Sequence, residues 1–150
     1  MPQLITEDLV ILDLEAADRH AATRALGERL AAAGRVTDLD AFLADVRKRE
    51  EQMATGLPGG IGIPHARSAA VTEPTLGFAR SSSGVDFGAE DGPAHLIFLI
   101  AAPAEGGDEH LKILAALARR LMRPAFRQSL HDAAQPVDVV DIVTREVVPS

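Results

Sequence analysis

The chain has 150 residues, no cysteine and a formal net charge of −7. This length predicts a single domain spanning residues 1–150, and the lack of cysteine excludes disulfides, thiolate nucleophiles and thiolate metal sites. The negative charge argues against a nucleic-acid partner, because a phosphate backbone needs a basic surface.

The sequence has no feature of a membrane-inserted or secreted protein. The longest apolar run, residues 96–104, is shorter than the ~20 residues of a membrane-spanning helix. The first ten residues lack the basic segment and apolar stretch of a secretory signal. We therefore expect a soluble, cytoplasmic protein.

The first third of the chain predicts a strand and two helices. The apolar run 9–14 predicts a strand, and residues 16–33 are good helix formers that end at Gly34. The second helix is predicted to begin after Thr37, as N-cap in a capping box with Asp40, and to run to about Met53.

The rest of the chain alternates predicted strands and helices. A turn over 56–60 leads into a short strand over 61–63, and strands or turns follow over 75–81 and 84–87. The most apolar strand, over 95–102, is predicted to be central. Helices are predicted over 108–122, 124–131 and 136–147. This order predicts an α/β fold with a sheet covered on both faces.

His65 ends the glycine-rich stretch 59–65 (GGIGIPH). A neutral imidazole is a competent nucleophile near pH 7 when its other nitrogen is held by a hydrogen bond. Glycine lets backbone N–H groups approach an anion, and Arg67 adds a cation. The stretch predicts a phosphoryl acceptor at the open end of the sheet. A loop histidine without a chemical role is the alternative, which a glycine-rich stretch alone does not exclude.

His110 is the second candidate histidine, in the first turn of the predicted helix 108–122. It shares a helical stripe with Leu114 and Leu117, so we expect it on the inner face near the sheet edge. A helix N-terminus also favours a bound anion. The alternative is a partly buried histidine that is satisfied by a backbone carbonyl.

Two further residues have both a functional and a structural interpretation. Arg49 could hold phosphate oxygens through its guanidinium, or it could be a solvated charge in the run 47–51. Thr55 could donate its hydroxyl to a phosphate or only end the preceding helix.

A metal site is a further alternative, with His65 and His110 as two ligands and Asp or Glu completing the site. No local His-x-x-x-His spacing supports it, so we expect no metal and no cofactor. His20, His95 and His131 have no supporting neighbours and are predicted to be structural.

Several stretches together resemble a known family: Arg49-Glu50, Thr55-Gly56, residues 60–67 (GIGIPHAR), 84–87 (GVDF) and 108–111 (DEHL). They are similar to the EIIA domain of the fructose/mannitol type in the bacterial phosphoenolpyruvate-dependent sugar phosphotransferase system. The resemblance covers about residues 4–147, and residues 4–6 and 65–68 look most like the fructose branch. The sequence departs from the family pattern at two positions: Pro58 stands where glycine is common, and Gly62 stands where alanine is usual.

The resemblance implies a three-layer α/β/α sandwich with a central mixed β-sheet. It also implies that His65 receives a phosphoryl group from the phosphohistidine of HPr and passes it to a cysteine of EIIB, for uptake and phosphorylation of a sugar such as fructose. His110 would orient the phosphoryl group, and Arg49 would help to hold it. Thr55, Gly60, Gly62 and Arg67 would bind phosphate, and the membrane would be met only through the EIIB/EIIC permease.

The family resemblance leaves a second function open. A nitrogen-type regulatory EIIA would be phosphorylated on the matching histidine but would control other proteins by docking. The fructose-like stretches favour the sugar phosphocarrier. Because two proteins must reach one imidazole in turn, we expect a shallow apolar rim around His65.

Overall fold

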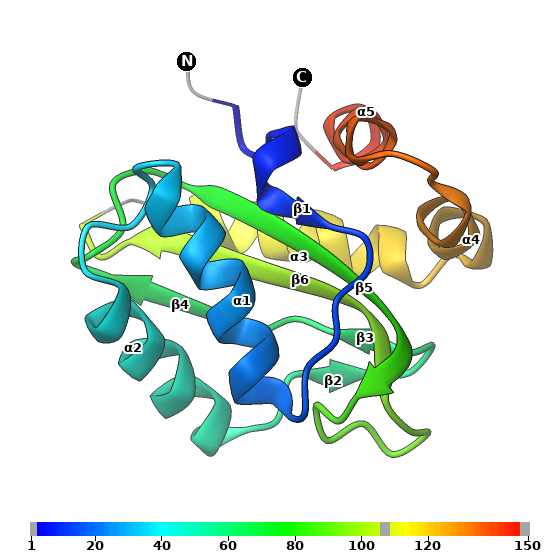
Figure 1. Cartoon of the computed structure of the whole chain (residues 1–150), viewed down its shortest axis with the longest axis horizontal. Coiled ribbons are helices and arrows are strands. Elements are labelled where there is room, and N and C mark those ends of the chain that lie inside the picture. Colours follow the sequence, from blue (N-terminus) through cyan, green and yellow to red (C-terminus); the bar gives the residue numbers. More distant parts are fainter. Residues whose placement is uncertain (1–2, 106–108, 148–150) are drawn as a thin grey trace.

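The computed structural model describes residues 3–105 and 109–147. A six-stranded mixed sheet lies between two layers of helices (Figure 1). One face is covered by α1 (Arg19–Ala32) and α2 (Leu39–Gln52), and the other by α3 (Glu109–Leu121), α4 (Pro124–Asp132) and α5 (Pro136–Glu146). The predicted three-layer α/β/α sandwich is confirmed.

The sheet contains β1 (Val10–Ile11), β2 (Gly56–Leu57), β3 (Ile61–Gly62), β4 (His65–Ser68), β5 (Thr75–Val85) and β6 (Ala94–Pro103). As its apolar sequence predicts, β6 is central: it pairs antiparallel with β5 and parallel with both β3 and β4. β1 lies parallel to β5, and β2 lies antiparallel to β3. The sheet is therefore mixed, as expected.

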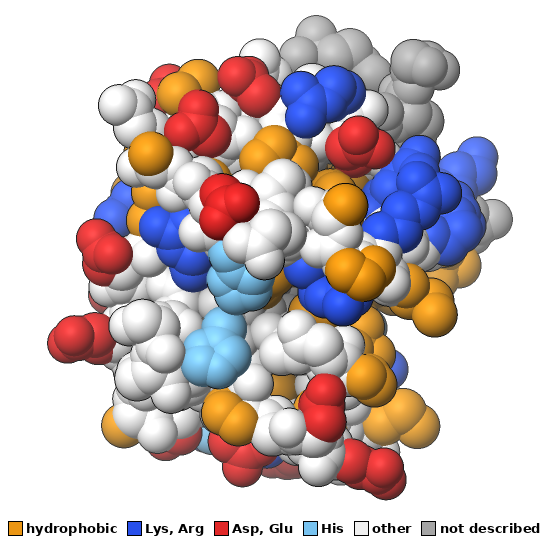
Figure 2. All heavy atoms as spheres, turned by 90° about the vertical axis from the view of Figure 1, so that its right-hand side faces the viewer, with side chains coloured by type: hydrophobic (Ala, Val, Ile, Leu, Met, Phe, Trp, Pro, Cys, Tyr) orange, Lys and Arg blue, Asp and Glu red, His pale blue; other side chains and the backbone are white. Residues whose placement is uncertain are grey.

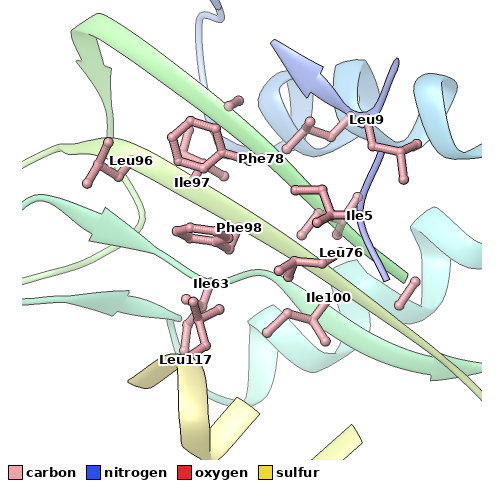
Figure 3. Close-up of a cluster of buried hydrophobic side chains, with 14 of the residues drawn as sticks. Ile5, Leu9, Ile63, Leu76, Phe78, Leu96, Ile97, Phe98, Ile100 and Leu117 are labelled. Atoms are coloured by element: carbon pink, nitrogen blue, oxygen red, sulfur yellow. The ribbon is translucent and has the colours of Figure 1, made fainter. Parts of the chain in front are cut away.

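Side chains of β5 and β6 form the centre of the hydrophobic core (Figure 3). Phe78 and Phe98 are cross-strand partners whose ring centroids lie 4.9 Å apart. Such an aromatic pair contributes about 0.5–1.5 kcal/mol beyond the burial of its area. Ile5 and Leu9 near the N-terminus and Leu117 of α3 belong to the same buried cluster. The core therefore holds the central strands as a fixed frame for the residues at the sheet edge.

The strands differ from the predicted ones at four places, the first being β2, whose two residues lie inside the predicted turn over 56–60. Of the predicted strand over 9–14 only β1 is present: Leu9 ends a short 3-10 helix, η1 (Glu7–Leu9), and residues 12–14 are not in a strand. The predicted segments 75–81 and 84–87 are largely one strand, β5, with an irregularity between Arg80 and Val85. β4 was not predicted, since its four residues alternate in polarity and follow a proline.

The helices match the predicted ranges closely, with one error at an N-cap. The N-cap of α2 is Asp38, whose carboxylate accepts a hydrogen bond from the Ala41 amide at 3.1 Å. Thr37 as the N-cap is wrong, because its hydroxyl donates to the Ala70 carbonyl instead. The predicted start of α3 at Asp108 lies outside the described residues. Within the described ranges, no helix has the length and apolar character needed to cross a membrane.

Candidate functional site

His65 lies where the chain passes from β3 to β4. Both strands run parallel to β6, with Gly62 opposite Ile97 and His65 opposite Ile100. Pro64, just before His65, has no N–H and a fixed φ, so the ladder is interrupted between the two strands. His65 therefore begins a strand partway along β6, and its predicted place at the open end of the sheet is wrong.

The backbone next to His65 selects one tautomer of its ring. Nδ1 of His65 lies 2.8 Å from the carbonyl oxygen of Ile63. A carbonyl oxygen only accepts hydrogen bonds, so Nδ1 carries the proton, and the neutral ring has its lone pair on Nε2. The residue is half-buried. This arrangement meets the stated condition for a nucleophilic imidazole, because one ring nitrogen is held by a hydrogen bond and the other has the lone pair.

A groove of about 470 Å³ follows β4 between α2 and α3, and His65 lines it. Its apolar lining consists of Ala66, Ile100, Ala102, Leu111 and Leu114. Leu111 is 53% exposed, which is unusual for a large apolar side chain. The first turns of α3 thus give the groove an apolar rim that faces solvent.

Charged side chains line the same groove: Asp45, Lys48, Arg49 and Arg67. Among the described residues of the lining, three cations face one carboxylate, in a chain whose net charge is −7. Arg67 follows His65 by two positions in β4, so both side chains project from the same face of the strand. The groove therefore combines an imidazole with cationic side chains that attract an anion.

Arg49 lies in the last turn of α2 and is half-buried. One of its nitrogens donates to the Met53 carbonyl over 3.4 Å. A guanidinium has five N–H donors, so this single long hydrogen bond leaves donors for an anion in the groove. The structure thus brings Arg49, Arg67 and His65 to one groove.

His110 lies in the first turn of α3, and its side chain is outside the described part of the structure. The next residue, Leu111, lines the groove. Leu114, which follows His110 by four positions and so shares its helical stripe, also lines it. The helix turn that carries His110 is therefore next to the groove.

Thr55 is directed away from the groove, into the protein. It is buried, its hydroxyl donates to Oε1 of Glu50 at 2.6 Å, and its amide donates to Oε2 of Glu50 at 2.7 Å. The groove lining among the described residues does not include Thr55. Of its two predicted roles, the geometry favours the one at the end of the helix.

The glycines before His65 also use their polar groups within the fold. Gly59 donates its amide to the Asp91 carboxylate at 2.9 Å, and Gly60, at φ +77°, accepts from the amides of His95 and Leu96. Gly62 is a strand residue whose added Cβ would lie 2.7 Å from the Phe87 ring. In the described structure these glycines shape the approach to His65, and Gly60 and Gly62 do not line the groove.

Sequence reasoning missed the structural part played by Glu50. The alternative interpretation of Arg49 treats the run 47–51 as solvated charges, but Glu50 is only 8% exposed. The available signal was helical spacing, since Glu50 follows the buried Phe42 and Val46 by eight and four positions. A carboxylate on the inner stripe of a helix needs a specific partner.

A second hollow, of about 660 Å³, is lined by His95 and His131 together with Arg80, Asp13 and Glu15. Figure 2 shows two histidine side chains next to each other on one face of the molecule, with both signs of charge around them. Nδ1 of His95 lies 2.8 Å from the Ser81 carbonyl oxygen. Burial, followed by His95 and Arg80, lowers the pKa of His131.

Among the described residues, no three His, Cys, Asp or Glu side chains form a metal-binding group.

Comparisons with known proteins place this architecture in one family. Residues 3–146 match the family described as "Phosphoenolpyruvate-dependent sugar phosphotransferase system, EIIA 2". A relative from Haloferax volcanii, the "PTS system fructose-specific EIIA component", is 43% identical over 141 residues, or 93% of this chain and 92% of that protein.

Two further relatives agree with this family. The "PTS system fructose-specific EIIABC component" of Bacillus subtilis is 35% identical over 144 residues, which are 95% of this chain and 23% of that longer protein. The solved structure of "Nitrogen Regulatory Protein IIA-Ntr from Neisseria meningitidis" has a TM-score of 0.86 and 30% identity, and the match covers 94% of this chain and 97% of that chain. The chain therefore belongs to the EIIA 2 family of the phosphoenolpyruvate-dependent sugar phosphotransferase system, whose members are phosphotransferases that pass on a phosphoryl group.

Proposed function

We propose that His65 is the phosphoryl acceptor of this chain and that it reacts through Nε2. The supporting observation is the 2.8 Å hydrogen bond between Nδ1 and the Ile63 carbonyl, which assigns the lone pair of the neutral ring to Nε2. The cations that line the groove support the same assignment. Phosphoryl transfer needs positioning and charge neutralisation more than covalent work by the protein, and this groove suits both needs.

The proposed donor is the phosphohistidine of HPr, and the proposed recipient is a cysteine of EIIB. In the first step a P–N bond forms at Nε2 of His65 as the P–N bond of the donor breaks. In the second step the cysteine thiolate forms a P–S bond as the P–N bond of His65 breaks. Nδ1–H remains bonded to Ile63 throughout, so the phosphorylated ring is cationic and is a good leaving group.

The groove cations have separate proposed roles around the phosphoryl group. Arg49 and Arg67 bind its oxygens, where a guanidinium offers paired donors. The phosphoryl group brings up to about two negative charges, so these side chains interact more strongly with phosphorylated His65 than with the unphosphorylated ring. His110 orients the phosphoryl group from the first turn of α3. Thr55, Gly60 and Gly62 act indirectly by shaping the loop that presents His65.

We further propose that residues 1–150 act as one cytoplasmic EIIA domain and that the sugar is fructose. The fructose assignment is supported by the names of the Haloferax volcanii and Bacillus subtilis relatives. The chain meets the membrane only through an EIIB/EIIC permease. Its chemistry uses side chains alone, without a metal or cofactor.

The nitrogen-type regulatory module is the second candidate function. It is supported by the structural likeness to IIA-Ntr of Neisseria meningitidis, at 30% identity. Both candidates predict a phosphohistidine at position 65, so labelling of His65 does not separate them. Transfer onward to an EIIB cysteine does, because only the sugar carrier needs that step.

The test is stepwise labelling. The chain is incubated with phosphoenolpyruvate, enzyme I and HPr, and acid-labile phosphate is mapped by peptide. We expect the label on the peptide that contains His65, and we expect fructose-type EIIB to remove it. Label retained with every EIIB tried would favour the regulatory module. No label with the HPr of the host, while a control EIIA is labelled, would reject the carrier function.

A further inference from the structure

We infer that Glu50 is a positioning residue that fixes the orientation and the tautomer of His65 from inside the protein. The inference rests on the proposed function, since it concerns how the proposed acceptor is prepared for reaction. Glu50 does not line the groove among the described residues, so its action on His65 is indirect. The connection runs through Thr55 and Ile63.

Glu50 holds Thr55 with both of its carboxylate oxygens. Oε2 accepts from the Thr55 amide at 2.7 Å, and Oε1 accepts from the Thr55 hydroxyl at 2.6 Å. Both are short, charge-assisted hydrogen bonds between buried groups, which are stronger than bonds between neutral groups. Thr55 is therefore fixed immediately after the end of α2.

Thr55 in turn holds the residue whose carbonyl faces the ring. The Thr55 carbonyl accepts from the Ile63 amide at 3.1 Å. The Ile63 carbonyl then accepts from Nδ1 of His65 at 2.8 Å. Because Pro64 restricts the backbone between them, the direction of the Ile63 carbonyl follows from the position of Ile63. Two residues thus connect the Glu50 carboxylate to the imidazole.

The connection acts through position and not through charge. The amide and the carbonyl of Thr55 belong to different peptide groups, so the two hydrogen bonds do not polarise one shared peptide unit. Loss of the carboxylate would let Thr55 and then Ile63 shift. The ring would lose the acceptor that keeps the proton on Nδ1, and the lone pair would no longer be held on Nε2.

The buried carboxylate has its own counter-ion. The Glu50 side chain is only 6% exposed, and Nη1 of Arg19 lies 3.2 Å from Oε2. Nε of Arg19 also donates to the Asp86 carbonyl at 3.0 Å. The pair therefore ties the first residue of α1 to the end of α2 and to the segment after β5. The Arg19 side chain is 24% exposed, so the ion pair is only partly buried. The Glu50 carboxylate itself is buried and accepts three hydrogen bonds, which fix its position better than a surface ion pair would.

The experiment compares Glu50→Gln with Glu51→Gln. Both variants replace a carboxylate with an amide of the same size, but Glu51 is exposed and belongs to no described contact of the site. Two quantities are measured in each chain: the rate of phosphoryl acceptance from phospho-HPr, and the ¹⁵N chemical shifts of the His65 ring, which report its tautomer. Glu50→Asp is a second variant, which keeps the charge beside Arg19 but withdraws the carboxylate from Thr55.

We expect Glu50→Gln to slow acceptance by about 10-fold to 100-fold, since small displacements of a reacting group have effects of this size. The His65 ring should change from the Nδ1–H tautomer to a mixture, and Glu51→Gln should alter neither quantity. Glu50→Asp should show the same change of tautomer, and it replaces Glu50→Gln if that variant does not fold.

Two outcomes would overturn the inference. One is a wild-type His65 that is protonated on Nε2. The other is an unchanged tautomer in the Glu50 variants, whatever their transfer rate, because slower transfer would then reflect general destabilisation. If wild type accepts no phosphoryl group at all, the proposed function fails, but the tautomers of the chains still decide the part played by Glu50.

Discussion

The groove at His65 and the hollow at His95 contain the same local arrangement. In each, Nδ1 of the histidine lies 2.8 Å from a backbone carbonyl oxygen, that of Ile63 in the groove and that of Ser81 in the hollow. Both residues are half-buried. The tautomer with a lone pair on Nε2 is therefore present at both places.

The surroundings of the two rings differ. The groove is lined by Lys48, Arg49 and Arg67 beside an apolar rim. In the hollow, Nη1 of Arg80 donates to three carbonyls at the end of α4, and Asp13 and Glu15 add negative charge. Among the described residues, cations outnumber carboxylates in the lining of the groove, whereas carboxylates outnumber cations in the lining of the hollow. The comparison therefore teaches that two rings with the same tautomer can differ in how well their surroundings suit an anion, and we expect this difference to separate the proposed acceptor from a structural histidine.

The largest expected effect comes from removing each ring in turn. His65→Ala should abolish labelling, because no other group replaces Nε2, whereas His95→Ala should leave labelling intact. Each variant loses the hydrogen bond from Nδ1 to a carbonyl, and that loss should lower the unfolding free energy by about 1 kcal/mol in both. Labelling by phospho-HPr and urea unfolding measure the two effects. Label on a folded His65→Ala chain would contradict the assignment of the acceptor.

The next effect tests the cations. Arg49→Gln should lower the transfer rate by about 100-fold, the usual effect of removing a donor that stabilises transition-state charge. The matched control is Arg47→Gln, in the same helix, since Arg47 is exposed and does not line the groove. Single-turnover kinetics with phospho-HPr measure both variants. Equal rates for the two would mean that Arg49 is an ordinary surface charge.

A smaller effect on transfer is expected from substituting one glycine near each histidine, Gly62 in the segment before His65 and Gly84 beside His95. Gly62→Ala would place a Cβ atom 2.7 Å from the buried Phe87 ring. Gly84→Ala would place a Cβ atom 3.0 Å from the His95 ring, and the backbone of Gly84 has a φ of +85°, which strains any other residue. Each should lose about 1–3 kcal/mol of stability. Only Gly62→Ala should also slow phosphoryl transfer in the folded protein, because only Gly62 shapes the approach to His65. Thermal unfolding and transfer rates together test this; slowing by both variants would remove the distinction.

The smallest effect concerns pH and the hollow alone. Partial burial, His95, Arg80 and Arg127 lower the pKa of His131 below its ordinary value of 6.5, and Asp132 opposes them. The unfolded chain then binds the proton more readily. Stability should therefore fall as pH decreases from about 6.5 through the lower pKa of the folded state. His131→Gln should flatten this part of the urea-unfolding profile, and transfer at His65 should not change. An unaltered profile would count against the lowered pKa.

Periodicity and composition predicted most of the architecture. The unbroken apolar run of β6 identified the central strand, and caps, glycines and prolines set the helix ends to within about three residues. β4 was missed because four residues of mixed polarity carry no strand signal of their own. Its pairing with β6 depends on long-range register, which local sequence does not encode.

The site was predictable only in part. Helical spacing and the stretch around His65 identified candidates, but their meeting in one groove required the sheet pairing that places β4 between α2 and α3. The family resemblance supplied this combination in advance. Glu50 was not singled out because it lies in a run of charged residues. The polar groups of Thr55, Gly59 and Gly60 were expected to face an anion, since local sequence does not reveal their hydrogen-bond partners inside the fold.

The cations in the described lining of the groove have a kinetic consequence. A bound phosphoryl group cancels part of their charge, so the partner that arrives before transfer and the partner that arrives after it meet different electric fields at the same surface. Association with the donor should therefore depend more steeply on ionic strength than association with the recipient. The salt concentration would then change the relative rates of association with the two partners. The chain would also release its donor more readily after transfer, because the phosphoryl group has reduced the positive charge at the surface that they share.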